Sequence, residues 1–287
     1  MSSPPAPMHP LSVLVLTKDE AQDLPGCLRS VSWSDDVHVF DSFSADDTAG
    51  VARALGAQVT QRAFDGYAAQ RNAALTGLAF KHPWLLILDA DERVPAASAE
   101  AMARFAANAP EGVDACRVRR RDFFLGTWLA RAQISPYYIR LVRPGRVHYE
   151  REINEVLKVD GTVHELDAPF DHYPFSKGLH HWLDKHNRYS SMEARHIVQA
   201  RLEGTPFSLR QAFLARDFSE RRFHQKELFY RLPARPLLKW LYIVLARRAF
   251  LDGHAGMTYA FLQTIYEYMI VVKTAELESR RPEIDVP

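Results

Sequence analysis

The sequence predicts an α/β fold with a doubly wound, mostly parallel sheet, followed by a C-terminal helical extension. Two observations support this fold class. Short apolar, β-branched runs alternate with helical patterns through the first 110 residues, and Gly, Pro and Asp residues mark the joins. Repeated strand, helix, strand units with short links are typical of a parallel sheet covered by helices on both faces. In such a sheet, ligands bind at the carboxyl ends of the strands.

Four strands are expected in this half of the chain. The first is LSVLVLT at residues 11–17, a continuous apolar run, and the others are expected at 37–40, 57–60 and 84–88. Helices are expected from Asp23, where a proline follows closely, and at 51–55, 66–78 and 96–107. Asp41 follows the second strand and Asp89 follows the fourth. Both aspartates should therefore lie at the crevice.

Beyond residue 112 the pattern changes to shorter strands with Gly and Pro turns, expected at 115–119, 138–142 and 156–159. Residues 1–10 lack a basic start and an apolar run, so they indicate a disordered leader rather than a secretory signal. We expect a core domain at 11–205, divided at residue 110 into a nucleotide-binding half and an acceptor half. Residues 206–287 should form a helical, amphipathic extension.

Composition excludes several classes of protein. The formal net charge of the 287-residue chain is +1, whereas proteins that bind nucleic acid through bulk charge carry a strong basic excess. Cys27 and Cys116 stand far apart, which argues against a disulfide framework or a cysteine zinc site and fits the reducing cytosol. The sequence therefore predicts a cytoplasmic protein that does not bind nucleic acid.

The extension has the composition of a membrane-surface anchor. Basic residues crowd residues 216–235, and apolar, aromatic helices are expected at 237–251 and 257–272. Charged and polar interruptions leave both helices short of the roughly 20 apolar residues that a spanning helix needs. We expect them to lie on an anionic membrane surface, with Trp240, Tyr242 and Tyr259 near the head groups. A helical cap over the core or a dimer interface is the alternative.

Asp89 and Asp91 form a DxD pattern directly after a buried strand. Strand periodicity would place both carboxylates on one side, where they could converge on a divalent cation. Mg²⁺ uses few protein ligands and fills its shell with water and substrate phosphates, so two carboxylates and a diphosphate suffice. Such a cation would neutralise a departing nucleotide diphosphate. A solvated acidic turn is the alternative interpretation.

Longer blocks of sequence carry a resemblance. The order LSVLVLTKDEAQDLPGCLRSV, VFDSFSADDT, GYAAQRNAAL and WLLILDADERV resembles family 2 glycosyltransferases of the glycosyltransferase A fold. Later blocks, among them RRRDFFLGTWL, YYIRLVRPG, HYPFSKGLHHWLDKHNRYSSMEA and FLDGHAGMTYAFLQTIYEY, resemble the lipopolysaccharide-core glucosyltransferase-like branch. The resemblance spans nearly the whole chain. Where that branch reads Val-His-Glu, this chain reads Ile153-Asn154-Glu155, which leaves the acceptor open.

The resemblance implies an activity and a place in the cell. It implies an inverting, metal-dependent hexosyltransferase that moves a sugar from a nucleotide-diphosphate donor, UDP above all, to a glycan or a lipid-linked acceptor. The cofactor would be Mg²⁺ or Mn²⁺. The product would belong to lipopolysaccharide or another cell-envelope polysaccharide. The enzyme would act as a peripheral protein on the cytoplasmic face of the inner membrane.

The resemblance also implies site residues. The nucleotide-sugar site would comprise Thr17, Lys18, Glu20, Asp41, Ser44, Gln70, Arg71, Asp89 and Ala90. Each has a structural alternative: Asp41 and Ser44 could cap the next helix, Lys18 could be a surface lysine, and the helix that carries Arg71 could present a solvated face. Asp89, Asp91 and His172 would hold the metal, although His172 could be a structural histidine.

An inverting transfer needs a base for the acceptor hydroxyl. Glu155 matches the glutamate of the family motif, and Glu152 is the reserve, although both stand in a loop of balanced charge. Two further groups are open. Arg117, Arg119 and Arg121 could form a basic rail or a solvated edge. Trp182, His186 and Tyr189 share a helical stripe that is more often packing than ligand.

Two other functions fit the same fold. A sugar nucleotidyltransferase also uses carboxylates and a metal, but it generally follows its first strand with a Gly-rich loop, and here the turn is Thr17-Lys18-Asp19-Glu20. A non-catalytic, membrane-associated binding module is the second alternative. The presence of both Asp89 and Asp91 favours an enzyme.

Overall fold

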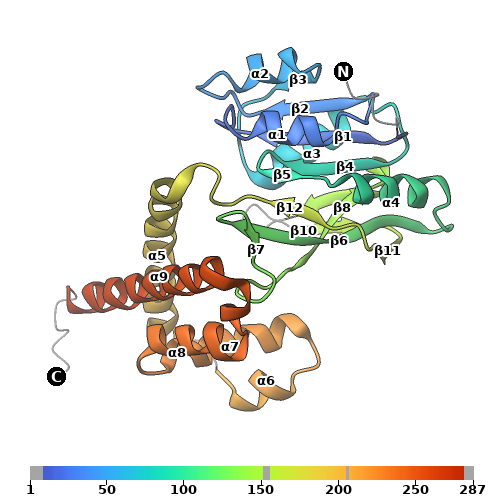
Figure 1. Ribbon diagram of the computed structural model, residues 1–287. Coiled ribbons are helices and arrows are strands. Elements are labelled where there is room, and N and C mark those ends of the chain that lie inside the picture. The colour runs from blue at the N-terminus through green and yellow to red at the C-terminus, as the bar shows by residue number, and fades with distance from the viewer. Residues whose placement is uncertain (1–8, 151–155, 205–206, 281–287) are drawn as a thin grey trace. The chain divides into compact units, whose positions relative to one another are not determined.

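The computed structural model describes residues 9–150, 156–204 and 207–280 (Figure 1). The chain folds as two compact units. The first contains the residues up to 123 together with 134–177, and the second contains 124–133 together with the residues from 178 onward. The units therefore divide at 177/178, ahead of the boundary at 205 expected from the sequence. The reason is that α5 (Gly178–Leu202) packs along α9 (Gly253–Ser279) in the second unit.

The first half of unit 1 is a parallel sheet. Its strands are β1 (Ser12–Thr17), β2 (Val37–Asp41), β3 (Gln58–Gln61) and β4 (Leu85–Asp89), in the spatial order β3-β2-β1-β4. The four strands predicted from the apolar runs are confirmed to within a residue or two at their ends. In the register, Thr17 lies beside Asp41 and Leu16 lies beside Asp89. The carboxyl end of β1 is thus flanked by both aspartates.

Both faces of this sheet are covered. Val13 and Val15 of β1 belong to the core formed with α1 (Leu24–Ser30), α2 (Thr48–Ala54) and α4 (Ala96–Ala107). Leu14, which points the other way, belongs to a second core formed with α3 (Tyr67–Gly77). All three side chains are fully buried. Burial on both faces explains why the strand reads as an unbroken apolar run, and it confirms the doubly wound arrangement.

The second half of unit 1 makes the sheet mixed rather than mostly parallel. Its strands are β5 (Glu92–Arg93), β6 (Val113–Phe124), β8 (Tyr137–Val142), β11 (Thr162–Glu165) and β12 (Phe170–His172). β8 is antiparallel to both β4 and β6, between which it lies (Figure 1). β12 runs parallel to β6 and antiparallel to β5, which places His172 opposite Glu92. This pairing brings β12 beside the DxD turn.

A separate hairpin stands after β8. A 3-10 turn at Pro144–Arg146 leads into β9 (Val147–Glu150), which pairs antiparallel with β10 (Val156–Val159). Two buried residues of β9, Val147 and Tyr149, pack into the same core as α3. The hairpin is therefore anchored to the face of the sheet that α3 covers.

Unit 2 is helical apart from the short strand β7 (Thr127–Trp128). Its elements are α5, α6 (Leu209–Leu214), α7 (Phe218–Arg231), α8 (Arg235–Leu241), a π-helical turn (Tyr242–Ala246), a 3-10 turn (Ala249–Asp252) and α9. The sequence predicts one continuous helix at 237–251, and this prediction is wrong. The chain turns at Arg248, which has the left-handed conformation (φ 59°) that ends an α-helix, and again at Gly253, whose φ of 62° is also positive.

Contacts within unit 2 hold this turn. The Arg247 side chain donates hydrogen bonds to the carbonyls of Arg131 and Gln133, and the Asp252 carboxylate accepts from the backbone N–H groups of Arg131 and Ala132. Segment 124–133 thereby fixes the path from α8 to α9. Across the described parts of the chain, every helix is too short or too polar to cross a bilayer.

Candidate active site

Asp41, the last residue of β2, is fully buried and surrounded by donors. Its carboxylate accepts hydrogen bonds from Thr17 Oγ1 (2.9 Å), Gln61 Nε2 (2.9 Å), the Ser44 backbone N–H (3.0 Å) and the Ser44 hydroxyl. Burial would raise the pKa of Asp41, but the donors from Gln61, Ser44 and Thr17 hold it below its ordinary value. The N-cap position of α2 is Asp47, whose side chain makes no capping hydrogen bond, so neither Asp41 nor Ser44 occupies the capping position considered for them.

The turn after β1 is tied to its surroundings. Lys18 Nζ donates to the Phe43 carbonyl at 2.6 Å, so Lys18 is tethered across to the turn after β2. Glu20 Oε1 pairs with Lys177 at 2.8 Å. Glu20 Oε2 is buried and has no hydrogen-bond partner among the described residues. Burial raises the pKa of Glu20 to about 7 despite the neighbouring Lys177. A buried acceptor without a donor is suited to receive one from a ligand.

Asp89, at the end of β4, is held by two arginines. Arg71 Nη2 of α3 lies 3.3 Å from one carboxylate oxygen, and Arg140 Nη2 of β8 lies 2.9 Å from the other. Arg140 also pairs with the buried Glu92, whose other oxygen accepts the Asp89 backbone N–H at 3.0 Å. Burial acts to raise the pKa of Asp89, but the charges of Arg140 and Arg71 lower it well below its ordinary value.

Asp91 faces a different partner. Strand β4 ends at Asp89 and the chain turns before β5, so the alternation rule that placed the two aspartates side by side does not reach Asp91. Asp91 Oδ2 lies 3.2 Å from His172 Nε2. His172 Nδ1 donates to Asp122 Oδ1 at 2.5 Å. Burial lowers the pKa of His172, but the bonds to Asp122 and Asp91 outweigh it and raise the pKa to about 9.

These contacts separate the three metal ligands predicted from the sequence, Asp89, Asp91 and His172, into two groups. Within residues 9–150, 156–204 and 207–280, no group of three or more His, Cys, Asp and Glu side chains is arranged to hold a metal ion. Asp89 is engaged by arginines, whereas Asp91 and His172 remain as a pair. A carboxylate beside an imidazole whose second nitrogen bonds to another carboxylate is the usual surrounding of a metal-bound histidine. Two protein ligands fit Mg²⁺ or Mn²⁺ when diphosphate and water complete the shell.

The remaining predicted residues of the nucleotide-sugar site are buried near the same sheet edge. Gln70 is 3% exposed, donates to Ser42 Oγ and accepts from Arg62, so it links α3 to the end of β2. Ala90 is buried between Asp89 and Asp91, and its carbonyl accepts a hydrogen bond from Arg93. The hydrogen bonds of Gln70 thus position α3 against the end of β2, and the bond to the Ala90 carbonyl positions the turn after Asp89.

Four functional candidates were not predicted from the sequence. Arg140, Asp122 and Lys177 contact predicted site residues, and Asn72 exchanges two 2.8 Å hydrogen bonds with the Tyr149 backbone, which fastens α3 to β9. Arg140 stands in an apolar strand pattern where a buried charge needs a partner, and that is the one clue the sequence holds. The other three depend on pairings between distant segments.

The predicted bases Glu152 and Glu155 lie outside the described residues. The three arginines of β6 each have a partner: Arg117 pairs with Glu165, Arg119 bonds Tyr137 Oη, and Arg121 pairs with Asp171. A basic rail would therefore have to recruit side chains that are already paired.

The aromatic stripe on α5 packs within unit 2. The Trp182 and His186 rings stack with centroids 3.5 Å apart, and His186 meets the edge of Tyr266 on α9. Trp182 and His186 therefore pack within unit 2, whereas Tyr189 is 43% exposed.

Comparisons with known proteins find similarity to glycosyltransferases. A lipopolysaccharide core biosynthesis glycosyltransferase LpsC of Rhizobium meliloti (strain 1021) is 22% identical over 97% of this chain and 97% of its own length. An uncharacterised glycosyltransferase of Rickettsia typhi (strain ATCC VR-144 / Wilmington) is 26% identical over 70% of this chain and 71% of that protein. Glucosyl-3-phosphoglycerate synthase of Mycobacterium tuberculosis, solved with Mn²⁺ and UDP, is 20% identical with a TM-score of 0.34, and the match covers 39% of this chain and 44% of that one.

The family model described as "Glycosyl transferase family 2" matches residues 12–160, which is more than half of the chain and includes β1, the DxD turn and the hairpin of β9 and β10. The chain belongs to glycosyl transferase family 2.

Proposed function

We propose that this protein is an inverting, metal-dependent hexosyltransferase of cell-envelope polysaccharide or lipopolysaccharide biosynthesis. The donor is a nucleotide-diphosphate sugar, with UDP as the nucleotide, and the acceptor is a glycan or a lipid-linked glycan. The relationship to LpsC over nearly the full length of both chains supports this assignment. The protein works at the cytoplasmic face of the inner membrane.

One observation carries the proposal. The carboxyl end of β1 lies between Asp41 on β2 and Asp89 on β4, and the turn after Asp89 presents Asp91 to His172. This is the edge of a doubly wound sheet at which nucleotides bind. A nucleotide diphosphate placed there would meet acidic groups for a cation together with the basic groups Arg71 and Lys177.

Each group has a chemical part to play. Asp91 and His172 would hold Mg²⁺ or Mn²⁺, and Asp122 keeps the imidazole oriented. When bound, the cation supplies positive charge that stabilises the leaving diphosphate. Arg71 and Lys177 add fixed positive charge near the same oxygens. Glu20 Oε2 accepts a hydrogen bond from a ribose hydroxyl or the base. Asp41 has its four acceptor positions filled by protein donors, so contact with the base requires that one donor, such as Gln61, give way.

The general base is assigned to Glu155, with Glu152 as the second candidate. A carboxylate there would take the proton from the acceptor hydroxyl as that oxygen attacks the anomeric carbon opposite the diphosphate. Asn72 clamps the Tyr149 backbone at 2.8 Å, a few residues before these glutamates in the sequence.

The direct test is release of UDP from candidate UDP-sugars by the purified protein, with and without Mn²⁺. Asp91→Ala should abolish release, a loss of at least about 100-fold, because the metal loses its carboxylate ligand. Glu165→Ala, which removes an exposed carboxylate that pairs with Arg117, is the matched control and should leave the rate unchanged. Circular dichroism checks that both variants fold. Undiminished turnover in Asp91→Ala would refute the metal role of this residue.

We also propose that α8 and α9 place the protein on an anionic membrane surface. Phe261, Ile265, Tyr268 and Val272 of α9 are each about half exposed and recur at helical spacing. Lys239, Arg247 and Arg248 provide positive charge in the neighbouring segment. An exposed apolar stripe with basic neighbours is the composition of an interfacial helix.

A further inference from the structure

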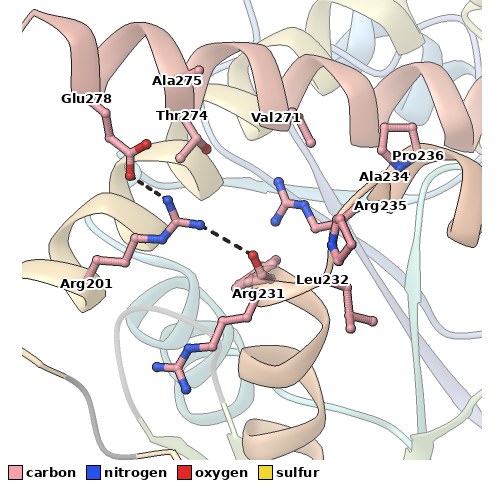
Figure 2. Close-up of a pocket in the computed structure, with 12 residues that line it drawn as sticks. Arg201, Arg231, Leu232, Ala234, Arg235, Pro236, Val271, Thr274, Ala275 and Glu278 are labelled. Carbon is pink, nitrogen blue, oxygen red and sulfur yellow. Dashed lines mark hydrogen bonds and ion pairs between the residues drawn. The ribbon is translucent and has the colours of Figure 1, made fainter.

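A pocket of about 370 Å³ lies within unit 2, between the end of α7, the start of α8 and one face of α9 (Figure 2). Its volume falls in the range of roughly 300–1,000 Å³ typical of small-molecule sites. Three arginines line it, Arg201, Arg231 and Arg235, together with Glu278 and apolar side chains such as Val271. Nothing in the proposed sugar transfer uses this pocket.

Two of the arginines face each other across the hollow. Figure 2 shows the guanidinium groups of Arg201 and Arg235 pointing toward one another below α9. The Arg231 side chain turns away, and its guanidinium lies 4.4 Å from the centre of the Phe207 ring. Two cations that face each other repel, so an anion between them would be favoured. The arrangement is that of an anion site.

Arg235 is the stronger indication. Its side chain is only 5% exposed, and Nε pairs with the buried Glu267 at 3.4 Å. Nη1 is buried and has no hydrogen-bond partner among the described residues, although the residue lines the pocket. A buried guanidinium donor without a partner is costly. A phosphate oxygen is the acceptor that guanidinium geometry matches best.

Arg201 already has a carboxylate partner within the protein, Glu278, with which an anion would compete. Its Nη1 pairs with Glu278 at 2.5 Å, and its Nη2 donates to the Tyr230 carbonyl at 3.4 Å. Both side chains of the Arg201–Glu278 pair are more than two-fifths exposed, so this contact is weak and easily exchanged. An entering anion can therefore take the place of the Glu278 carboxylate.

The pocket adjoins the apolar stripe of α9. Val271, Thr274 and Glu278 form the pocket face of the helix, and Phe261, Ile265, Tyr268 and Val272 form the stripe. At about 100° per residue, Val271 and Val272 lie only a quarter turn apart around the helix. The two faces are therefore neighbours.

We propose that the pocket binds a phosphate group between Arg201 and Arg235, and that this phosphate belongs to an amphiphile whose apolar part lies along the stripe of α9. The chemistry recognised is a phosphate ester. A phospholipid or a phosphorylated lipid-linked glycan carries it at a membrane, and a soluble phosphate ester carries it in solution. Phosphate binding in this pocket does not depend on the proposed transferase activity.

The first arm of the test uses a soluble probe. Glycerol phosphate is titrated into the full-length protein by calorimetry. Arg201→Gln should weaken binding about tenfold, and Glu278→Gln should tighten it several-fold because the competing carboxylate is gone. Arg222→Gln is the control, since Arg222 stands nine residues before Arg231 and hence on the opposite face of α7. Absence of binding, or equal affinity in Arg201→Gln and the wild type, overturns the proposal.

The second arm separates the two sources of phosphate. Vesicles of phosphatidylcholine with phosphatidylglycerol are compared with pure phosphatidylcholine in a flotation assay. Arg201→Gln should reduce binding to the anionic vesicles at least fivefold more than Arg222→Gln does. If both variants lose the same amount of vesicle binding, the attraction is general charge attraction, and the proposal that the phosphate belongs to a membrane lipid is overturned. Asp91→Ala should keep full phosphate binding, so failure here and failure of the transfer assay are distinguishable.

Discussion

Asp122 orients His172 for its proposed role as a metal ligand. It is 3% exposed, accepts from His172 Nδ1, and is itself paired with Arg120 Nε at 3.0 Å. The Arg120 contact holds the carboxylate in place. His172 is thus oriented by a chain of buried contacts, while its Nε2 side is left to Asp91.

Asp122→Asn should weaken Mn²⁺ affinity by about 10–100-fold without abolishing transfer at saturating metal, because the residue positions a ligand and does not touch the cation. The measurement is the Mn²⁺ concentration that gives half-maximal UDP release. A rate that stays near zero at any Mn²⁺ concentration would contradict this positioning role, and so would an unchanged half-maximal concentration.

Glu20 predicts a pH dependence of stability. Its pKa in the fold is about 7, above the ordinary 4.5, so the folded state holds the proton more tightly than the unfolded state. The stabilisation that protonated Glu20 gives the folded state is complete below about pH 4.5 and is lost as the pH rises through 7. Glu20→Gln removes that dependence. As the pH rises from 5 to 8, the free energy of unfolding of the variant should rise by about 2 kcal/mol relative to that of the wild type. A fully buried group would contribute ~1.4 kcal/mol for each unit of the pKa difference. The expected effect is smaller because Glu20 is partly exposed to solvent. Urea unfolding measures the difference, and a gap that stays constant with pH would contradict it.

At the scale of elements, the parallel strands were predictable and several contacts were not. β1 and β4 are buried on both faces, so their sequences are continuous apolar runs with clear ends. The break at Arg248 was missed because apolar periodicity continues through it, and the conformation is fixed by segment 124–133, more than 100 residues earlier. Likewise, nothing local shows that Asp89 will be held by Arg140.

Asn72 shows how one side chain joins two elements. Its amide donates to the Tyr149 carbonyl and accepts the Tyr149 backbone N–H, as a neighbouring strand would. Asn72→Ala should cost about 1–3 kcal/mol in the free energy of unfolding, because both backbone groups lose their partner. Asn108→Ala, which removes one exposed bond to the Arg104 carbonyl, is the control and should cost less than about 1 kcal/mol. Equal losses would show that the clamp on β9 adds nothing.

At the scale of the whole molecule, the proposed membrane association depends on the surface of unit 2. Deleting the chain from Leu237 onward should release the protein from membranes, but it also removes α9, against which α5 packs. Point substitutions are cleaner. Ile265→Ser should reduce binding to anionic vesicles several-fold, because a half-exposed apolar side chain leaves the stripe. Leu55→Ser, an equally exposed change in unit 1, should have no effect. High salt should weaken wild-type binding, as expected of a peripheral protein that uses basic residues.

The sequence also indicated the general division of the chain into an α/β part and a helical part, but not its boundary. Residues 178–202 read as an ordinary helix, and only the packing of α5 along α9 assigns them to unit 2. The pocket beside Arg235 was hidden for the same reason. Its walls come from α5, from the consecutive helices α7 and α8, and from α9, and these three stretches are distant in sequence.

The double burial of β1 and β4 has a consequence for how such an enzyme can diversify. An inward substitution on either face of these strands meets a packed core, so the strands tolerate little change. Lys18 and Asp19, just beyond the end of β1, are exposed and face no such restriction, and this turn belongs to the proposed nucleotide-sugar site. Relatives can therefore acquire new donors or acceptors by altering these short turns, while the strands that support them stay the same.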